Sequence, residues 1–192
     1  MADRFEIRLS GSGGQGVILA GVILAEAAAL WDEKNAVQSQ SYGPEARGGA
    51  SRSEVIISDG DIDYPKATDI DVLLALTQEA CERYLGDLKS EGTLIVDSDL
   101  VSQVPDGAYR VVRLPIVSTA TDELGRPQVA NIVSLGSIVE LTDVVTKEAL
   151  TNAVISRVPK GTEDLNRSAL EAGYKLVRGL DAKASATEAA GD

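Results

Sequence analysis

Six residues near the start of the chain form the motif that most directly suggests chemistry. Phe5, Ile7 and Leu9 alternate on one side, as in a strand whose other face is partly solvated, and Gly-Ser-Gly-Gly-Gln-Gly follows at 11–16, before a long apolar run. A strand that breaks into a G-x-G-x-x-G turn and continues as a helix lets backbone N–H groups approach an anion, and the helix start adds its positive dipole end. This context favours a phosphate-bearing ligand, while the alternative is that the glycines only permit close packing of strand and helix. The candidate binding residues of the turn are Gly11, Gly13, Gly14, Gln15 and Gly16.

A second glycine-rich segment, at 41–49, reads Ser-Tyr-Gly-Pro-Glu-Ala-Arg-Gly-Gly and is expected to be a loop. It follows the second predicted strand, and in a doubly wound sheet the carboxyl ends of the strands gather at the edge where ligands bind. Arg47 is placed to meet a carboxylate or phosphate, and an ion pair with Glu45 is the alternative. Asn131 either points its amide into the same cleft or caps a predicted helix. The candidate residues of the loop are Ser41, Tyr42, Gly43, Arg47, Gly48 and Gly49.

Composition restricts what the chain can do by itself. It contains no histidine and one cysteine, which excludes Ser-His and Cys-His nucleophiles, histidine zinc sites, internal disulfides and self-contained iron–sulfur clusters. A net charge of −12, with no visible cluster of lysine or arginine, argues against nucleic acid as a partner. Any reaction run by this chain alone therefore depends on carboxylates, Lys, Arg, Tyr or a cofactor.

Dinucleotide binding needs a further residue that is missing from its expected place. In such folds an acid at the end of the second strand, about 20 residues after the glycine turn, binds the ribose hydroxyls. Asp32 and Glu33 have nearly that spacing but precede the second predicted strand, at 36–40, which is polar and uncharged at its end. We therefore expect a phosphate or pyrophosphate ligand other than NAD. A stand-alone nucleotide-binding oxidoreductase and a scaffolding domain with a vestigial turn are the alternative functions.

The pattern along the 192 residues predicts a single α/β domain with a Rossmann-like, mainly parallel sheet flanked by helices. Strands are expected at 4–9, 36–40, 51–58, 71–75, 93–96 and 109–114, and helices at 15–31, 78–88, 117–124, 131–141, 146–158 and 162–180. The domain spans 1–180, and 181–192 is expected to be a disordered tail. Because the longest apolar run, 17–25, is too short to span a membrane and no signal peptide is visible, we expect a cytoplasmic protein without a membrane partner.

Together the two glycine-rich segments resemble a known family. The turn at 11–17, the loop at 41–49 and Ser-Arg-Ser at 51–53 closely resemble the gamma subunit of 2-oxoacid:ferredoxin oxidoreductases. Asn-Ile-Val-Ser-Leu-Gly at 131–136 is similar to a later helix segment of that family, so the resemblance covers about residues 5–180. It is strongest to the subunits of 2-oxoglutarate enzymes, and pyruvate, branched-chain 2-oxoacid and indolepyruvate relatives share the same motifs.

This resemblance implies a subunit of an enzyme complex that is not active alone. The family carries out oxidative decarboxylation of a 2-oxoacid to an acyl-CoA (succinyl-CoA for 2-oxoglutarate), or the reverse carboxylation, with ferredoxin as the electron partner. The resemblance places thiamine diphosphate with Mg and the iron–sulfur clusters on partner subunits: alpha, beta and, in some complexes, a ferredoxin-like delta. It gives this chain no catalytic residue and no metal. Coenzyme A, whose pyrophosphate suits a glycine-rich helix start, becomes the candidate ligand of the turn, the loop and Asn131.

Overall fold

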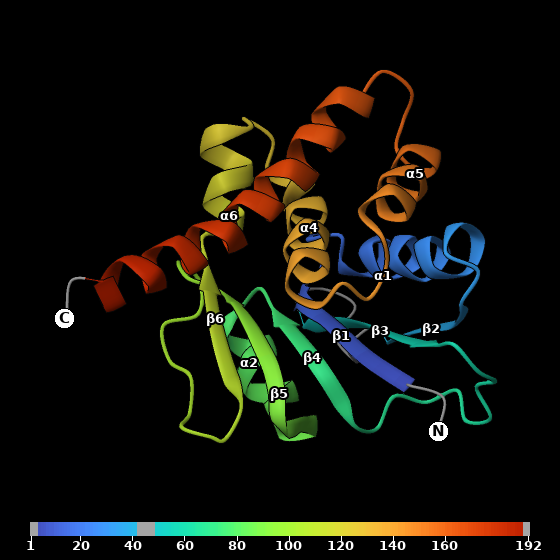
Figure 1. Cartoon of the computed structure of the whole chain (residues 1–192), viewed down its shortest axis with the longest axis horizontal. Helices are drawn as coiled ribbons and strands as arrows, with labels where there is room; N and C mark the ends of the chain where they lie inside the picture. The colour runs from blue at the N-terminus through green and yellow to red at the C-terminus, as the bar shows by residue number, and fades with distance from the viewer. Residues whose placement is uncertain (1–3, 42–48, 190–192) are drawn as a thin grey trace.

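The computed structural model describes residues 4–41 and 49–189, with backbone alone for 181–189, as a six-stranded sheet with helices on both faces (Figure 1). The strands are β1 (Arg4–Ser12), β2 (Asn35–Ser41), β3 (Ala50–Ser58), β4 (Ile70–Ala75), β5 (Leu88–Asp97) and β6 (Arg110–Leu114). Their order across the sheet is β2-β3-β1-β4-β5-β6. From β1 to β6 neighbouring strands are parallel, whereas β3 runs antiparallel to β1 and β2. The predicted mainly parallel α/β fold is therefore confirmed.

The antiparallel direction of β3 follows from the short connection that precedes it. Residues 42–49 alone join β2 to β3, whereas parallel neighbours need a crossover of a dozen or more residues. Ser41 at the end of β2 pairs with Arg52, and Ser12 at the end of β1 pairs with Ala50. The glycine turn after β1 and the connection after β2 therefore leave the sheet at the same edge.

Helices cover the two faces of the sheet unequally. One face carries α1 (Val17–Glu26), α4 (Ala130–Thr142), α5 (Lys147–Arg157) and α6 (Glu163–Ala189), and α2 (Gln78–Tyr84) lies on the other (Figure 1). Shorter pieces are the π-helical turns η1 (Ala27–Trp31) and η3 (Thr119–Glu123), the single turn α3 (Ile116–Ser118), and the 3-10 turns η2 (Leu85–Asp87) and η4 (Pro127–Val129). Ile7 and Leu9 pack into the core beneath α1 and α4, while Ile56, Leu73 and Leu94 pack into the core beneath α2. Alternation along each strand thus supplies two separate cores.

α4 lies between the sheet and α6, and two glycines bring these helices into close contact (Figure 1). A Cβ added to Gly136 would overlap the carbonyl oxygen of Leu170, and one added to Gly173 would overlap that of Val133. The Ser137 hydroxyl donates to the Gly173 carbonyl at 3.3 Å across the same contact. No side chain fits at either glycine unless the backbones move apart.

Three features differ from the sequence expectation. The first helix begins at Val17 and ends in the π-helical turn η1. α6 continues to Ala189, through most of the segment 181–192 that was expected to be disordered, because its alanines favour a helix. Residues 190–192 lie outside the described residues. Glu6 and Arg8, on the strand face expected to be partly solvated, are 3% and 2% exposed. Among the described helices we find none whose length and apolar character would let it cross a membrane.

Candidate functional site

The glycine turn joins β1 to α1 in a conformation that requires glycine at two positions. The N–H of Gln15 donates to the carbonyl of Ser12 at 3.3 Å and closes a β-turn, in which Gly14 has φ of 94°. Gly16 follows as the N-cap of α1, with φ of 73°. Side chains at both positions would be strained, because L-residues avoid the left-handed region.

Two of the predicted binding residues hold the turn in shape. Gln15 folds back so that its Oε1 accepts a hydrogen bond from the Ser12 N–H at 2.7 Å, and this oxygen fills the space beside Gly11. Asn131, 4% exposed on α4, donates from Nδ2 to the carbonyl of Gly16 at 3.2 Å. Asn131 does not cap α4, since the N-cap is Val129. Both side chains therefore position the turn, and their contact with a ligand stays a prediction.

The turn lines a hollow of about 250 Å³, called the glycine hollow below, together with the start of α1 and the start of β3. Its walls are Ser12, Gly13, Gly14, Gly16, Val17, Ile18 and Ser51. Gly13 and Gly14 are exposed, their N–H groups have no acceptor among the described residues, and a Cβ on either would meet nothing within 4 Å. The first turn of α1 carries no acid. The glycine hollow can therefore receive the oxygens of an anion from backbone donors and the helix dipole.

Coenzyme A fits the glycine hollow in part. Backbone donors without a neighbouring carboxylate suit its pyrophosphate, but the volume lies below the roughly 300–1,000 Å³ of pockets that enclose a complete ligand. The hollow thus has room for one phosphate-bearing part of a larger molecule.

An iron–sulfur cluster does not fit, because the chain has one cysteine, and burial raises the pKa of its Cys81 thiol and keeps it neutral. Within 4–41 and 49–180, side chains form no acidic, histidine or cysteine cluster able to hold a metal.

The remaining predicted residues belong to the connection after β2. Ser41 ends β2 and is exposed, and Gly49 directly precedes β3, so both lie at the same edge of the sheet as the glycine turn. Tyr42, Gly43, Arg47 and Gly48 lie outside the described residues, and their roles stay predictions.

Sequence reasoning missed the part of the glycine hollow that β3 supplies. Ser51 reaches the hollow because Gly11 and Ser51 pair across the β1–β3 ladder. α2 anchors this end of β3: the Tyr84 hydroxyl donates to the Ala50 carbonyl at 3.1 Å, and Glu79 accepts from the Ala50 N–H at 3.4 Å. The short connection between β2 and β3 was the available signal, since it forces a hairpin in which β3 begins at the edge where β2 ends.

Asp32, the acid nearest in spacing to a ribose-binding residue, has a structural role. Its carboxylate accepts hydrogen bonds from the N–H and the hydroxyl of Thr146, at 2.6 and 2.7 Å, at the start of α5. Thr146 in turn caps α5 by accepting from the Ala149 N–H at 3.1 Å. Asp32 therefore holds the start of α5, and the expectation that the turn does not serve NAD stays a prediction.

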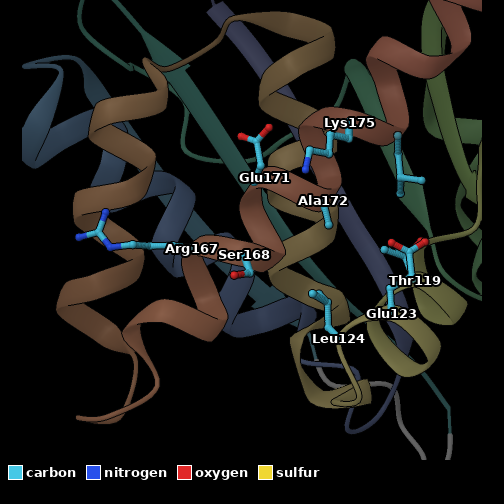
Figure 2. Close-up of a pocket in the computed structure, with 9 residues that line it drawn as sticks. Thr119, Glu123, Leu124, Arg167, Ser168, Glu171, Ala172 and Lys175 are labelled. Carbon is cyan, nitrogen blue, oxygen red and sulfur yellow. The ribbon is translucent and has the colours of Figure 1, made fainter.

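A larger cavity, about 570 Å³, lies between α6 and the segment that contains η3 (Figure 2). Arg167 and Lys175 line it together with Glu123 and Glu171, so its charges balance. None of its lining residues borders the glycine hollow. We therefore place the candidate site at the glycine hollow, although it is the smaller of the two.

Known proteins similar to this chain form one group. The family described as pyruvate ferredoxin/flavodoxin oxidoreductase matches residues 6–176. A Methanocaldococcus jannaschii protein named 2-oxoglutarate synthase subunit KorC is 52% identical, covering 92% of this chain and 96% of its own length. The structure of a keto/oxoacid ferredoxin oxidoreductase gamma subunit from Geobacter sulfurreducens has a TM-score of 0.86 and 58% identity, covering 93% of this chain and 98% of that one.

A further solved structure shares the fold at lower identity. The 2-oxoglutarate:ferredoxin oxidoreductase of Magnetococcus marinus, determined with 2-oxoglutarate, coenzyme A and succinyl-CoA bound, has a TM-score of 0.81 and 22% identity over 92% of this chain and 31% of that one. The family match spans the glycine turn, the loop after β2 and Asn131, which are the motifs that first indicated a gamma subunit. The chain therefore belongs to the pyruvate ferredoxin/flavodoxin oxidoreductase family, as a gamma subunit of the 2-oxoacid:ferredoxin type.

Proposed function

We propose that this chain serves a 2-oxoglutarate:ferredoxin oxidoreductase and that its glycine hollow binds the pyrophosphate of coenzyme A. The substrate assignment is supported by the relatives named 2-oxoglutarate synthase, which match at 40–52% identity over more than nine-tenths of the chain. Alpha and beta subunits, with a ferredoxin-like delta subunit where one is present, would complete the complex in the cytoplasm, and ferredoxin would accept the electrons.

The glycine hollow is the observation that carries the coenzyme A assignment. Gly13 and Gly14 present N–H groups that no described residue accepts from, beside the start of α1, where the helix dipole stabilises negative charge. Asn131 and Gln15 fix the backbone in this arrangement before a ligand arrives, which reduces the entropy lost on binding.

This chain binds and orients, and no side chain at the hollow transfers a proton. Thiamine diphosphate on a partner subunit supplies the decarboxylation chemistry when bound. The residues here hold the nucleotide end of coenzyme A at the sheet edge, so that its thiol end extends toward the neighbouring subunit. Positioning of this kind lowers KM for coenzyme A and leaves the chemical step to the partner.

The test is a carboxylate placed in the hollow of the assembled complex. We expect Gly13→Asp to raise the apparent KM for coenzyme A by about tenfold or more, since a like charge a few ångströms from phosphate costs at least about 1.4 kcal/mol. The KM for 2-oxoglutarate should change little. Gly179→Asp, an exposed position on α6 with open space around it, is the matched control for added charge. An unchanged KM for coenzyme A in a fully assembled Gly13→Asp complex would refute the assignment.

A further inference from the structure

A row of polar side chains crosses three strands on the face of the sheet that carries α2. Ser39 on β2, Glu54 on β3 and Arg8 on β1 lie in register with one another. Arg8 Nε donates to Glu54 Oε1 at 2.9 Å, and its NH1 donates to Asp87 Oδ2 at 2.5 Å. Arg8 is 2% exposed, so this guanidinium is buried and compensated by two carboxylates.

A pocket of about 480 Å³ opens beside this row, and we name it the arginine pocket. The charged residues that line it are Arg8, Arg52, Lys66, Glu54 and Asp87. Arg52 and Ser51 are consecutive in β3 and face opposite sides of the sheet, and Ser51 borders the glycine hollow. The two sites are therefore separated by the thickness of the sheet.

The arginine pocket has more positive than negative charge. Arg8 donates hydrogen bonds to both carboxylates, whereas Arg52 forms a looser ion pair with Glu54, with 3.5 Å between Arg52 Nε and Glu54 Oε1. Lys66 has no ion pair within the described part of the chain. Among the described residues, three basic and two acidic side chains line the pocket, so they leave one positive charge over in a protein whose net charge is −12. The cavity beneath α6, by contrast, carries balanced charges (Figure 2).

An aromatic ring holds the Arg52 guanidinium in place. The Cζ atoms of Arg52 and Arg8 each lie 5.4 Å from the centre of the Tyr84 ring, and Tyr84 is fixed by its hydrogen bond to the Ala50 carbonyl. A guanidinium that lies over an aromatic face is held by cation–π attraction, and its N–H groups stay available as hydrogen-bond donors. Arg52 is therefore positioned in advance to donate to an oxyanion, and Lys66 adds a second charge.

We propose that the arginine pocket is a second anion site, which binds the carboxylate or phosphate group of a small molecule through Arg52 and Lys66. Its volume lies within the range of small-molecule pockets, and paired basic side chains recognise such groups by charge-assisted hydrogen bonds. The site does not depend on the glycine hollow, so it stands apart from the proposed coenzyme A contact.

The experiment titrates the full-length chain, labelled with ¹⁵N, with inorganic phosphate and separately with glutarate, at constant ionic strength near 0.15 M. We expect saturable shifts of the Arg52 and Thr68 amides. Arg52→Gln and Lys66→Gln should each weaken the binding measured there by about tenfold. Arg83→Gln is the matched control, because its Cζ lies 5.7 Å from the same Tyr84 ring but the residue does not line the pocket.

Three outcomes would overturn the proposal. The first is the absence of saturable shifts at Arg52 and Thr68 with either anion. The second is an equal loss of binding in Arg83→Gln, which would indicate general charge attraction. The third is that Arg52→Gln binds phosphate normally but retains less of the partner subunits on purification, which would make the pocket a protein contact. Because Lys66 is exposed, Lys66→Gln keeps the test valid if Arg52→Gln fails to fold.

Discussion

The contact between Gly16 and Asn131 allows one sharp prediction about how the turn is built. Gly16→Ala introduces two separate penalties at the N-cap of α1. The first is conformational, because Gly16 has φ of 73° and an L-residue there costs about 1–2 kcal/mol. The second is steric, because the new Cβ would lie 2.7 Å from Nδ2 and 3.0 Å from Cγ of Asn131.

Relief of that contact displaces the Asn131 amide and breaks its hydrogen bond to the Gly16 carbonyl, which is worth about 1 kcal/mol. We therefore expect Gly16→Ala to lower the free energy of unfolding by about 2–3 kcal/mol in total. Gly14→Ala is the matched comparison: its φ of 94° brings similar strain, but no atom of the described residues lies within 4 Å of the added Cβ. Its cost should be about 1–2 kcal/mol.

Urea unfolding of five chains (wild type, Gly14→Ala, Gly16→Ala, Asn131→Ala and the Gly16→Ala, Asn131→Ala double variant) measures these free-energy costs. In the double variant the contact is gone, so its cost should fall short of the sum of the single costs by about 1 kcal/mol. Strict additivity, or a Gly16→Ala cost no greater than that of Gly14→Ala, would show that Asn131 does not hold the turn.

Two further predictions concern α6. Gly173→Ala should lower the free energy of unfolding by about 3 kcal/mol, because its Cβ overlaps α4 backbone, whereas Gly179→Ala in the same helix should be neutral or stabilising, as calorimetry or urea unfolding can show. Burial raises the pKa of Glu140, but hydrogen bonds from Arg178 and Lys147 outweigh it and bring the pKa below the ordinary 4.5. The stability that this carboxylate adds is therefore present above pH 4.5 and lost as the pH falls through its lowered pKa. Glu140→Gln should flatten the dependence of the free energy of unfolding on pH in that range. An unchanged slope would show that the Glu140 ion pairs do not stabilise the fold.

The glycine turn and most elements could be predicted because the signals that define them are local. Period-two and period-3.6 patterns located the strands and helices, and Gly11, Gly13 and Gly16 marked the strand-to-helix turn within a few residues of sequence. The direction of β3 was also available, since the connection from Ser41 to Ala50 is too short for a crossover. Local information thus located the turn that lines the glycine hollow, while its role in binding a ligand stays a prediction.

The tertiary partners of individual side chains could not be predicted. Asn131 contacts a carbonyl 115 residues away, and nothing near it in the sequence identifies that acceptor. Glu6 was expected at a partly solvated face, yet it is buried because the Thr68 and Asp69 N–H groups donate to it at 2.7 and 2.9 Å. A charged residue in a strand has the same local pattern whether water or a distant loop satisfies it.

The small size of the glycine hollow has a thermodynamic consequence. A surface that encloses part of a ligand leaves the rest to a neighbouring subunit, so occupancy by the ligand and association of the subunits become linked equilibria. If the neighbouring subunit raises the affinity for the ligand by some factor, the ligand raises the affinity of the two subunits for each other by the same factor. Coenzyme A bound between two subunits would thereby hold the complex together at dilutions where the subunits otherwise separate.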